Sequence, residues 1–364
     1  MSGMLVHEWL SRIGGSENVF EVLSEIFPDA ERFCLWNESD GRFTGVGETV
    51  LARTPLRASK ALSLPLMPLA WRMLPERDVD WVLCSSHLFA HHALFRGPAK
   101  DAPKLVYTYT PARYVWVPEL DGRGEGVLAR TVSAALKPLD RRRAQEPLSI
   151  AADSRFVAER IARVWDRDAT VIYPPVPVGD FAGEPDLTGP EQDLVESLPA
   201  DYLLGFSRFV PYKRLDAAIE AGIAADAPVV LAGAGPDEPR LRELAKRHPG
   251  GVTFVIQPSF AVLRELYRRA RLVVFAPIED FGIVPVEAMA SGTPVLANAV
   301  GGGSETVIDG VTGAHVHEWT RSELRNAVDR ASSASGDACI ARAADFDTSH
   351  FTEQITAWVE SQTR

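Results

Sequence analysis

The segment EDFGIVPVEAMASGTP at positions 279–294 carries the strongest fold signal in the chain. The apolar run Leu272–Ala276 in front of it is rich in valine and predicts a buried strand. The run Val286–Ala290 predicts a helix that ends at the following glycine and proline. The sequence therefore predicts a strand, a loop that carries Glu279, and a helix that carries Glu287.

The predicted loop and helix start would form a binding corner for an anion. Unpaired amides in the first turn of a helix collect partial positive charge, so negatively charged oxygens are favoured there. Gly282 has no side chain and lets the backbone approach a ligand closely. A glycine run at 301–303, before a further helix, is expected to support the corner. The amides that we expect to face the ligand belong to Phe281, Gly282, Ile283 and Val284.

The second half of the chain alternates predicted strands with predicted helices, which is typical of a doubly wound parallel sheet. Ligands bind such sheets outside the carboxyl ends of the strands. One of these strand ends is followed by Arg208 and Lys213, whose charges suit a diphosphate. The segment between the prolines at 174–177 and about Asp201 lacks a pattern and is expected to be a loop. The predicted strands are Leu203–Ser207, Val229–Ala232, Val252–Ile256, Leu272–Ala276 and Pro294–Asn298.

The first half begins with a predicted strand, Met4–His7, which is followed by Gly14 and Gly15 and then by a helix. Ser16 is the residue expected to cap this helix. A Gly-Gly turn before a helix can bring backbone amides against a phosphate. A plain tight turn explains the same two glycines, so they do not decide between the two readings by themselves.

Composition and charge argue against several classes of protein. The first 150 residues hold 18 basic and 18 acidic side chains, so the whole net charge of −11 lies in the remainder. An acidic total argues against a nucleic-acid-binding protein. The absence of a signal peptide and of any apolar run of transmembrane length predicts a cytoplasmic protein. A disulfide framework or zinc site is disfavoured, and a reducing compartment favoured, by three widely spaced cysteines, Cys34, Cys84 and Cys339.

Two stretches of the first half, Arg53–Arg77 and Arg130–Arg143, combine basic and apolar residues. One interpretation is a helical hairpin and a helix whose charges are solvated. The other is a surface that rests on anionic lipid at the inner face of a membrane. The second interpretation predicts that Leu66, Met67 and Trp71 insert into the membrane surface.

The spacing of Glu279 and Glu287, within E-D-F-G and E-A-x-A-x-G-x-P-V, resembles the signature of the retaining, nucleotide-sugar-dependent glycosyltransferases of family 4. The resemblance implies the α/β class and the GT-B fold, in which two Rossmann-like domains face each other across a cleft. In that fold a C-terminal helix crosses back to the first domain. The resemblance implies an acceptor-binding domain at residues 1–175, completed by 348–364, and a donor-binding domain at 176–347. The prolines at 174–177 are expected to form the linker.

The resemblance also implies roles for residues. Arg208 and Lys213 match an R-x-x-x-x-K element that grips the donor diphosphate. Glu279 would meet hydroxyls of the donor sugar, and Glu287 would meet the hydroxyls of the nucleotide ribose. A G-G-x-E element that faces the diphosphate favours the phosphate-binding interpretation of the glycine turn. The remaining donor contacts that the resemblance implies are Gly14, Gly15, Phe281, Gly282, Ile283 and Val284.

The segment Tyr107–Trp116 resembles a Y-x-H-T-P-x-R-Y-x-W run of a subgroup that includes mannosyltransferases of surface-polysaccharide assembly. Arg113 and Tyr114 are the implied acceptor contacts. Tyr109 stands where the run has a histidine near the acceptor and the donor sugar. A tyrosine can donate a hydrogen bond but is a poor base near neutral pH. Tyr109 could hold the acceptor, shape the site or mark altered activity, and an imidazole could instead come from His87, His91 or His92.

The implied reaction transfers a hexose, expected to be mannose from GDP-mannose, to an acceptor hydroxyl with retention of configuration. The family needs no metal or other cofactor, and the leaving phosphate is expected to help deprotonate the acceptor. No D-x-D or His-rich cluster suited to a hard cation is expected, which fits a metal-free site. The expected partners are a nucleotide sugar, a carbohydrate or lipid-linked glycan acceptor and an anionic membrane. The alternatives are a catalytically weak nucleotide-sugar-binding protein, a transferase that uses a UDP-sugar on a small soluble acceptor, and a sugar-nucleotide epimerase.

Overall fold

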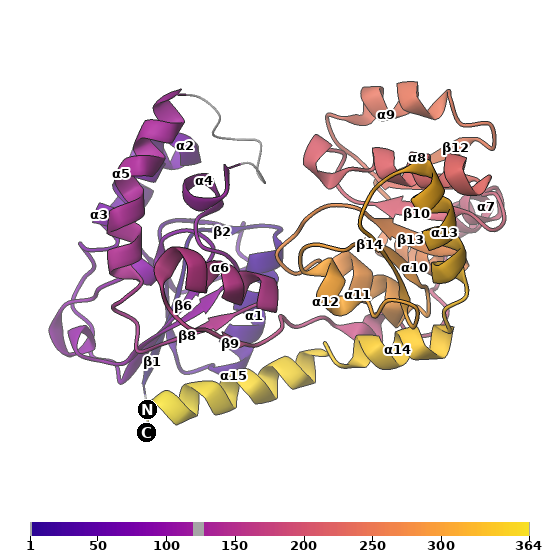
Figure 1. Ribbon diagram of the computed structural model, residues 1–364. Helices are drawn as coiled ribbons and strands as arrows, with labels where there is room; N and C mark the ends of the chain where they lie inside the picture. Colours follow the sequence, from indigo (N-terminus) through magenta and orange to yellow (C-terminus); the bar gives the residue numbers. More distant parts are fainter. Residues whose placement is uncertain (1, 119–126, 364) are drawn as a thin grey trace. The chain divides into compact units, whose positions relative to one another are not determined.

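The computed structural model describes residues 2–118 and 127–363 (Figure 1). The chain divides into two compact units. The first contains the described residues up to Pro175 together with those from Ser349 onward, and the second runs from Val176 to Thr348. The boundary falls inside the proline-rich segment at 174–177. Each unit has a parallel sheet and apolar core of its own.

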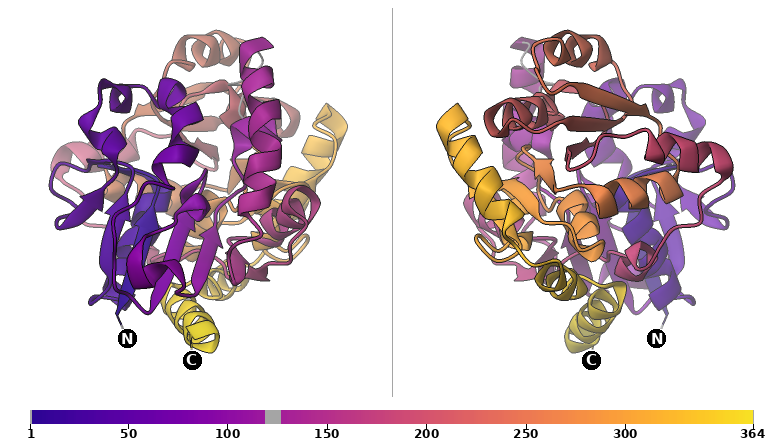
Figure 2. Two further views of the ribbon diagram at one scale, coloured as in Figure 1. Left: turned by 90° about the vertical axis from the view of Figure 1, so that its left-hand side faces the viewer. Right: turned by 90° about the vertical axis from the view of Figure 1, so that its right-hand side faces the viewer.

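The first unit is built around seven parallel strands in the order β5-β3-β1-β6-β7-β8-β9. The strands of this sheet are drawn in indigo to purple in the left view of Figure 2. The central strands β1, β6 and β7 are almost fully buried, as expected for parallel strands that are covered on both faces. A short pair, β2 (Leu10–Ser11) with β4 (Asn37–Glu38), lies outside this sheet. The seven strands are β1 (Gly3–His7), β3 (Glu31–Cys34), β5 (Val46–Glu48), β6 (Trp81–Ser86), β7 (Lys104–Thr108), β8 (Ser149–Ala152) and β9 (Thr170–Val171).

Side chains of the first sheet alternate between two apolar cores, because successive residues of a strand point to opposite faces. Met4 and Val6 of β1 join a core that includes Met67 and Trp71. Leu5, between them, joins the other core together with side chains of the first and last helices. The longer helices of this unit, with one short helix after β7, are α1 (Gly15–Ile26), α4 (Arg113–Trp116), α5 (Val127–Arg143), α6 (Arg155–Trp165) and α15 (Thr348–Thr363).

Helix α15 comes from the far end of the sequence and completes the second of these cores. The Phe351 ring lies 5.6 Å from the Tyr107 ring between centroids, and Trp358 Nε1 donates to Ser149 Oγ at 3.1 Å. The prediction that a C-terminal helix returns to the first domain is therefore confirmed. The buried side chains follow the helical period and are Phe351, Ile355, Trp358 and Val359.

The stretch that one of our two interpretations made a helical hairpin is instead a series of short helical pieces. Three of the pieces place a proline in the first turn, where the missing amide hydrogen costs nothing. Met67 and Trp71 are fully buried in the core, so the prediction that they insert into a membrane is wrong. The pieces are η1 (Val50–Arg53), η2 (Pro55–Ala58), α2 (Lys60–Ser63), η3 (Leu64–Leu66) and α3 (Met67–Ala70).

Helix α1 begins at Gly15 with Gly14 as its N-cap, so the predicted Ser16 cap is wrong. The Ser16 hydroxyl instead donates to Glu17 Oε2 at 2.9 Å. The other carboxylate oxygen of Glu17 accepts from the backbone N–H of Ser11 at 3.1 Å. Glu17 therefore takes the hydroxyl that we expected to cap the helix, and it ties the glycine turn to β2.

The second unit contains six parallel strands in the order β12-β11-β10-β13-β14-β15. Five of them lie close to their predicted positions, whereas the edge strand β15 (Gly313–Val316) was not predicted. The expected loop before Asp201 contains α7 (Gly189–Glu196), which begins with a capping box of Thr188 and Glu191. The other strands are β10 (Leu203–Phe206), β11 (Val229–Gly233), β12 (Val252–Ile256), β13 (Leu272–Phe275) and β14 (Val295–Asn298).

The helices of the second unit cover both faces of its sheet in the doubly wound manner that the sequence predicted. They include α8 (Asp216–Ala225), α9 (Glu238–Ala245), α10 (Phe260–Arg269), α11 (Ile283–Ala290), α12 (Gly303–Thr306), α13 (Arg321–Ser332) and α14 (Gly336–Ala344).

Candidate functional site

The strand order of the second sheet reverses between β10 and β13, which pair directly. In doubly wound sheets, ligands bind at the carboxyl ends of the two strands where the order reverses. The loop after β10 carries Arg208 and Lys213, and the loop after β13 carries Glu279. The structure therefore brings the predicted cations and the first glutamate to one edge of the sheet.

Lys213 and Glu279 form an ion pair between Nζ and Oε1. Their side chains are 18% and 19% exposed, so the pair is mostly buried but still reaches solvent. Arg208 is exposed, and its Nη2 donates to the Tyr212 hydroxyl at 2.6 Å. The edge thus holds a planar guanidinium and a compact ammonium, both of which bind phosphate oxygens well.

The corner itself is shaped by close backbone packing. Helix α11 begins directly after Gly282, whose φ of +83° lies in the left-handed region that favours glycine. The next loop closes against the corner, because Gly302 N donates to Glu279 O at 2.8 Å. A Cβ on Gly302 would lie 2.3 Å from the Cα of Phe281, so a larger residue would push the loop away. The glycine run at 301–303 therefore supports the corner, as predicted.

The residues at the start of α11 offer a ligand their backbone more than their side chains. Ile283 and Val284 form the first turn and are half-buried. The Phe281 side chain is 4% exposed, and its ring lies 5.6 Å from the Phe346 ring between centroids. Phe281 is thus part of the packed interior, and its predicted donor contact would have to be made by its amide.

Glu287 lies further along α11, and its Oε2 accepts a hydrogen bond of 2.9 Å from the Tyr267 hydroxyl of α10. Burial raises the pKa of Glu287, and the bond from Tyr267 partly opposes this rise. Burial also raises the pKa of Tyr267 well above its ordinary value, so the phenol keeps its proton. Tyr267 was not predicted as a site residue, because an aromatic residue on a helix is typical of an ordinary core position.

In the first unit, Tyr109 follows β7 at the carboxyl edge of the sheet. Its hydroxyl shares a hydrogen bond of 2.8 Å with Ser85 Oγ and donates to Ser16 O at 3.2 Å. Burial raises the pKa of Tyr109 well above its ordinary value, so this residue is not a base near neutral pH. The structure thus joins Tyr109 to the first turn of α1, directly after the predicted Gly14 and Gly15.

Two histidines, His7 and His87, lie beside Tyr109, and the carboxylate of Glu8 lies beside His87. Burial, and then the neighbouring His87, lower the pKa of His7 to about 4, and His7 Nδ1 lies 3.0 Å from Ser85 Oγ. Glu8 is fully buried and accepts backbone hydrogen bonds of 2.8 and 2.7 Å from the loop after β6. His87 Nδ1 lies 3.6 Å from Glu8 Oε2, and the His87 side chain is 23% exposed. An imidazole is therefore present at this edge, although it does not come from position 109.

Arg113 and Tyr114 open α4, which follows the same strand as Tyr109. Both side chains are half-buried, and Tyr114 packs against the first core of the unit. The backbone oxygen of Tyr114 accepts a hydrogen bond of 2.9 Å from Ser133 Oγ, which ties α4 to α5. The contact of these two residues with an acceptor stays a prediction.

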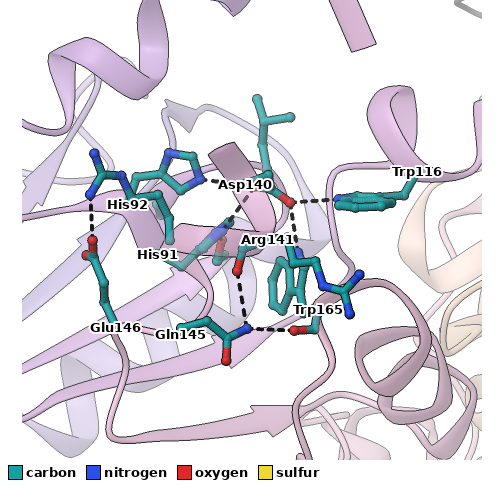
Figure 3. Close-up of polar contacts among 12 residues, drawn as sticks. His91, His92, Trp116, Asp140, Arg141, Gln145, Glu146 and Trp165 are labelled. Carbon is teal, nitrogen blue, oxygen red and sulfur yellow. Dashed lines mark hydrogen bonds and ion pairs between the residues drawn. The ribbon is translucent and has the colours of Figure 1, made fainter. Parts of the chain in front are cut away.

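His91 and His92, the other two histidines considered for Tyr109, are fully buried and surround Asp140 (Figure 3). Trp116 Nε1 and Trp165 Nε1 donate to Asp140 Oδ2 at 2.7 and 2.8 Å. The Nε2 atoms of His91 and His92 lie 3.1 and 3.0 Å from Asp140 Oδ1. Burial alone would raise the pKa of Asp140, but the two histidines hold it well below its ordinary value.

Within the described parts of the chain, His91, His92 and Asp140 form the group that could hold a metal ion. Their ligand atoms lie within 4.8 Å of one another. A structural zinc ion would be expected to have four ligands and deprotonated nitrogens facing it. Here Asp140 Oδ2 already accepts hydrogen bonds from two indole N–H groups, and indoles do not ligate metals. We interpret Asp140 as a hydrogen-bond centre that joins α4, α5, α6 and the turn η4 (Ala90–His92).

Comparison with known families places residues 192–342, most of the second unit, within the model described as "Glycosyl transferases group 1". D-inositol 3-phosphate glycosyltransferase of Mycolicibacterium smegmatis is 39% identical over 112 residues, which cover 29% of this chain and 26% of that protein. Alpha-1,3/1,6-mannosyltransferase alg-2 of Neurospora crassa is 43% identical over 76 residues, 19% of this chain and 16% of that protein. The matched stretches thus span about a quarter or less of the length of these two relatives.

Two solved structures resemble the chain over nearly its whole length. Alr3699/HepE of Anabaena, solved with UDP, has a TM-score of 0.71 at 18% identity and covers 99% of this chain and 100% of its own. It was also solved with UDP-glucose. Sucrose-phosphate synthase of Thermosynechococcus elongatus has a TM-score of 0.69 at 20% identity, with 99% and 98% covered. The chain therefore has the GT-B fold, with a parallel sheet in each of two Rossmann-like units, and the predicted fold class is confirmed.

Proposed function

We propose, from the match of residues 192–342 to the group 1 glycosyltransferases, that the chain transfers a hexose from a nucleoside-diphosphate sugar to an acceptor hydroxyl. The observation that carries the proposal is the sheet edge of the second unit. Lys213, Glu279 and the first turn of α11 lie there, after strands that flank the reversal of strand order. A cation, a carboxylate and the backbone amides of a helix start at such an edge suit a sugar that is linked to a diphosphate.

In the proposed reaction, the bond between the anomeric carbon and the diphosphate oxygen breaks, and its electron pair leaves with the diphosphate. Arg208, Lys213 and the first-turn amides of α11 stabilise the charge that develops on this leaving group. Glu279 binds hydroxyls of the donor sugar, and Glu287 binds the ribose. The acceptor oxygen attacks from the face on which the diphosphate departs, so the product keeps its configuration. This describes a retaining hexosyltransferase of family 4.

We propose mannose, donated by GDP-mannose, as the transferred sugar. The support is the resemblance of Tyr107–Trp116 to the mannosyltransferase run, together with a relative whose name is that of a mannosyltransferase. UDP-glucose is the second donor candidate, because a protein of the same fold was solved with it. The engaged hydroxyl of Tyr109 supports a different function, a nucleotide-sugar-binding protein that transfers sugar weakly.

A thermal-shift panel tests the donor site. GDP-mannose or UDP-glucose is expected to raise the melting temperature by several degrees, because a ligand at 100 times its Kd adds about 2.7 kcal/mol to the unfolding free energy. Free mannose and glucose, which lack the diphosphate, serve as controls and should not shift it. The shift should be the same in EDTA, because Arg208 and Lys213 rather than a metal ion meet the diphosphate.

Three outcomes would change the proposal. A panel in which no nucleotide sugar shifts the melting temperature would contradict the donor site. A shift that requires Mg²⁺ or Mn²⁺ would contradict the metal-free mechanism. A shift that is never accompanied by release of nucleoside diphosphate, with any acceptor offered, would favour the binding protein over the transferase.

We also propose that the first unit rests on the inner face of an anionic membrane, where a lipid-linked glycan acceptor would lie. No helix among the described residues combines the length and the apolar character needed to cross a bilayer. The segment that contains η1 to α3 nevertheless leaves large apolar side chains open to solvent beside the exposed Arg53 and Arg57. Membrane surfaces of this kind combine apolar and basic side chains. The open apolar side chains are Val50, Leu62, Leu66, Leu69 and Met73.

Sedimentation with anionic phospholipid vesicles checks this surface. The protein is expected to sediment with them at low salt and to be released at high salt, because each basic residue contributes roughly 1 kcal/mol that salt screens. The double variant Arg53→Glu/Arg57→Glu should lose this binding. Arg72 is unsuitable for reversal, because its Nη1 pairs with Glu146 at 2.8 Å.

The matched control reverses two exposed charges of the second unit, Lys246→Glu and Arg247→Glu, and should still sediment at low salt. Both double variants should bind nucleotide sugar normally. A wild-type protein that ignores anionic vesicles at low salt would show that these basic side chains are merely solvated and would favour a soluble acceptor.

A further inference from the structure

Tyr267 lies behind Glu287, the residue proposed above to bind the donor ribose. The two residues come from neighbouring helices, α10 and α11, and the Tyr267 hydroxyl donates to Glu287 Oε2 at 2.9 Å. Tyr267 is fully buried, whereas Glu287 is half-buried and reaches solvent. A ligand at this edge can therefore reach the carboxylate but not the phenol behind it.

The phenol is fixed in place from several sides. The ring centroid of Tyr267 lies 6.0 Å from that of Phe206 and 6.1 Å from that of Phe181. Its backbone oxygen accepts a hydrogen bond of 2.6 Å from Thr293 Oγ1. Thr293 in turn follows α11 and donates its backbone N–H to Ala288 O at 2.9 Å. The hydroxyl of Tyr267 is thus held in a set position relative to the helix that carries Glu287.

The direction of this hydrogen bond favours the ionised form of Glu287 and opposes the effect of burial. Burial raises the pKa of Tyr267 well above its ordinary value, so near neutral pH the phenol donates this hydrogen bond and Glu287 accepts it. Accepting favours the ionised carboxylate over the protonated form that burial of Glu287 would otherwise favour. An ionised carboxylate has about four acceptor positions, of which Tyr267 occupies one. The remaining positions suit ligand hydroxyls, which are donors.

We propose that Tyr267 is a positioning residue for nucleotide recognition, which holds the Glu287 carboxylate in the orientation that accepts hydrogen bonds from the ribose hydroxyls. The inference rests on the proposed function, which places a nucleoside diphosphate at this edge. Tyr267 does not touch the nucleotide and acts through Glu287 alone. It therefore contributes to the preference for a ribose over a deoxyribose rather than to the binding of diphosphate.

Isothermal titration with UDP, GDP and their 2′-deoxy analogues tests this role. The wild type is expected to bind the ribonucleotide about tenfold more tightly than its deoxy analogue, as the loss of one hydrogen bond to a charged group predicts. Tyr267→Phe removes only the hydroxyl and should reduce this preference several-fold. The affinity for the deoxy analogue should change little, because the diphosphate contacts remain.

Tyr202→Phe is the matched control. Tyr202 is also a buried tyrosine of the second unit, and its hydroxyl donates to Leu266 O at 2.8 Å rather than to Glu287. Its variant should therefore lose a buried hydrogen bond without any change in the ribose preference. Circular dichroism melts of each variant establish that it is folded before titration.

A double-mutant cycle with Glu287→Gln separates positioning from general loss of structure. Glu287→Gln should itself lose most of the ribose preference, and adding Tyr267→Phe should then lower it no further. Independent, additive effects of the two changes would overturn the inference. So would a Tyr267→Phe variant with the wild-type ratio of ribonucleotide to deoxynucleotide affinity.

The remaining outcomes distinguish this inference from the proposed function. A wild type that binds neither UDP nor GDP would overturn both. A wild type that binds them without preferring ribose would overturn the role of Tyr267 and leave the donor site standing. The Glu287→Gln variant tests the inference even if Tyr267→Phe does not fold. An unchanged ribose preference in Glu287→Gln would show that the carboxylate does not recognise the ribose, and Tyr267 would then have no role in that recognition.

Discussion

Replacing Lys213 by alanine is expected to slow sugar transfer about 100-fold, and Arg208→Ala is expected to have an effect of the same order. Each variant loses a cation that stabilises charge on the leaving diphosphate. In Lys213→Ala a second effect adds to the first, because Glu279 loses the ammonium that its Oε1 contacts. An unpaired carboxylate would then face an anionic donor.

Both rates are measured as nucleoside diphosphate released from a saturating donor, GDP-mannose or UDP-glucose. Lys246→Ala is the matched control, since Lys246 is an exposed lysine of the same unit that pairs with Glu243 on the surface. Its rate should stay within about twofold of the wild type, because an exposed pair contributes little. Near-normal turnover in both Arg208→Ala and Lys213→Ala would remove these residues from the diphosphate site.

Asp140→Asn is expected to lower the free energy of unfolding by about 3–5 kcal/mol, the range found when a buried charged group loses its partner. The asparagine side chain has one acceptor oxygen in place of two. Its NH₂ group would face either the two indole N–H groups or the two imidazoles that surround position 140. Either the indoles of Trp116 and Trp165 or the imidazoles of His91 and His92 would then be left unsatisfied in the interior. Each unsatisfied buried group adds to the cost.

Urea denaturation at pH 7 measures this loss. Asp166→Asn is the control, because Asp166 is exposed and has a φ of +58°, which asparagine tolerates. It should change the free energy of unfolding by less than about 0.5 kcal/mol. An Asp140→Asn variant as stable as the wild type would contradict the hydrogen-bond centre. Destabilisation of the wild type by EDTA, but not of Asp140→Asn, would show instead that the cluster holds a metal ion.

The second unit could be predicted closely because its signals are local. Apolar runs bounded by turn residues located β10 to β14, and the glutamate spacing located the corner at Gly282. Such signals need no knowledge of what a residue touches. Predictions were wrong where the role of a side chain depends on which group it bonds. The Ser16 hydroxyl, for example, donates to Glu17 and does not cap the helix. For the same reason the burial of Met67 was missed.

The buried polar clusters could not be predicted, because their members come from distant segments. Asp140 is 48 positions from His92, 24 from Trp116 and 25 from Trp165. The sequence marked His91 and His92 as imidazoles near a strand end, but residue type does not tell which way a side chain points. Tyr267 was overlooked on the same ground, since its hydroxyl meets Glu287 only after two helices pack together.

Because α15 belongs to the first unit but lies at the end of the sequence, the first unit can be completed only after the second unit has been synthesised. The second unit is one continuous segment, Val176–Thr348, and emerges from the ribosome before α15 does. At that moment the first unit lacks Phe351 and Ile355, so the face of its sheet around Tyr107 is still open to water. The second unit can thus finish folding before the first, which reverses the usual order for nascent chains. Until α15 packs, the nascent first unit exposes an apolar sheet face, and exposed apolar surface promotes aggregation.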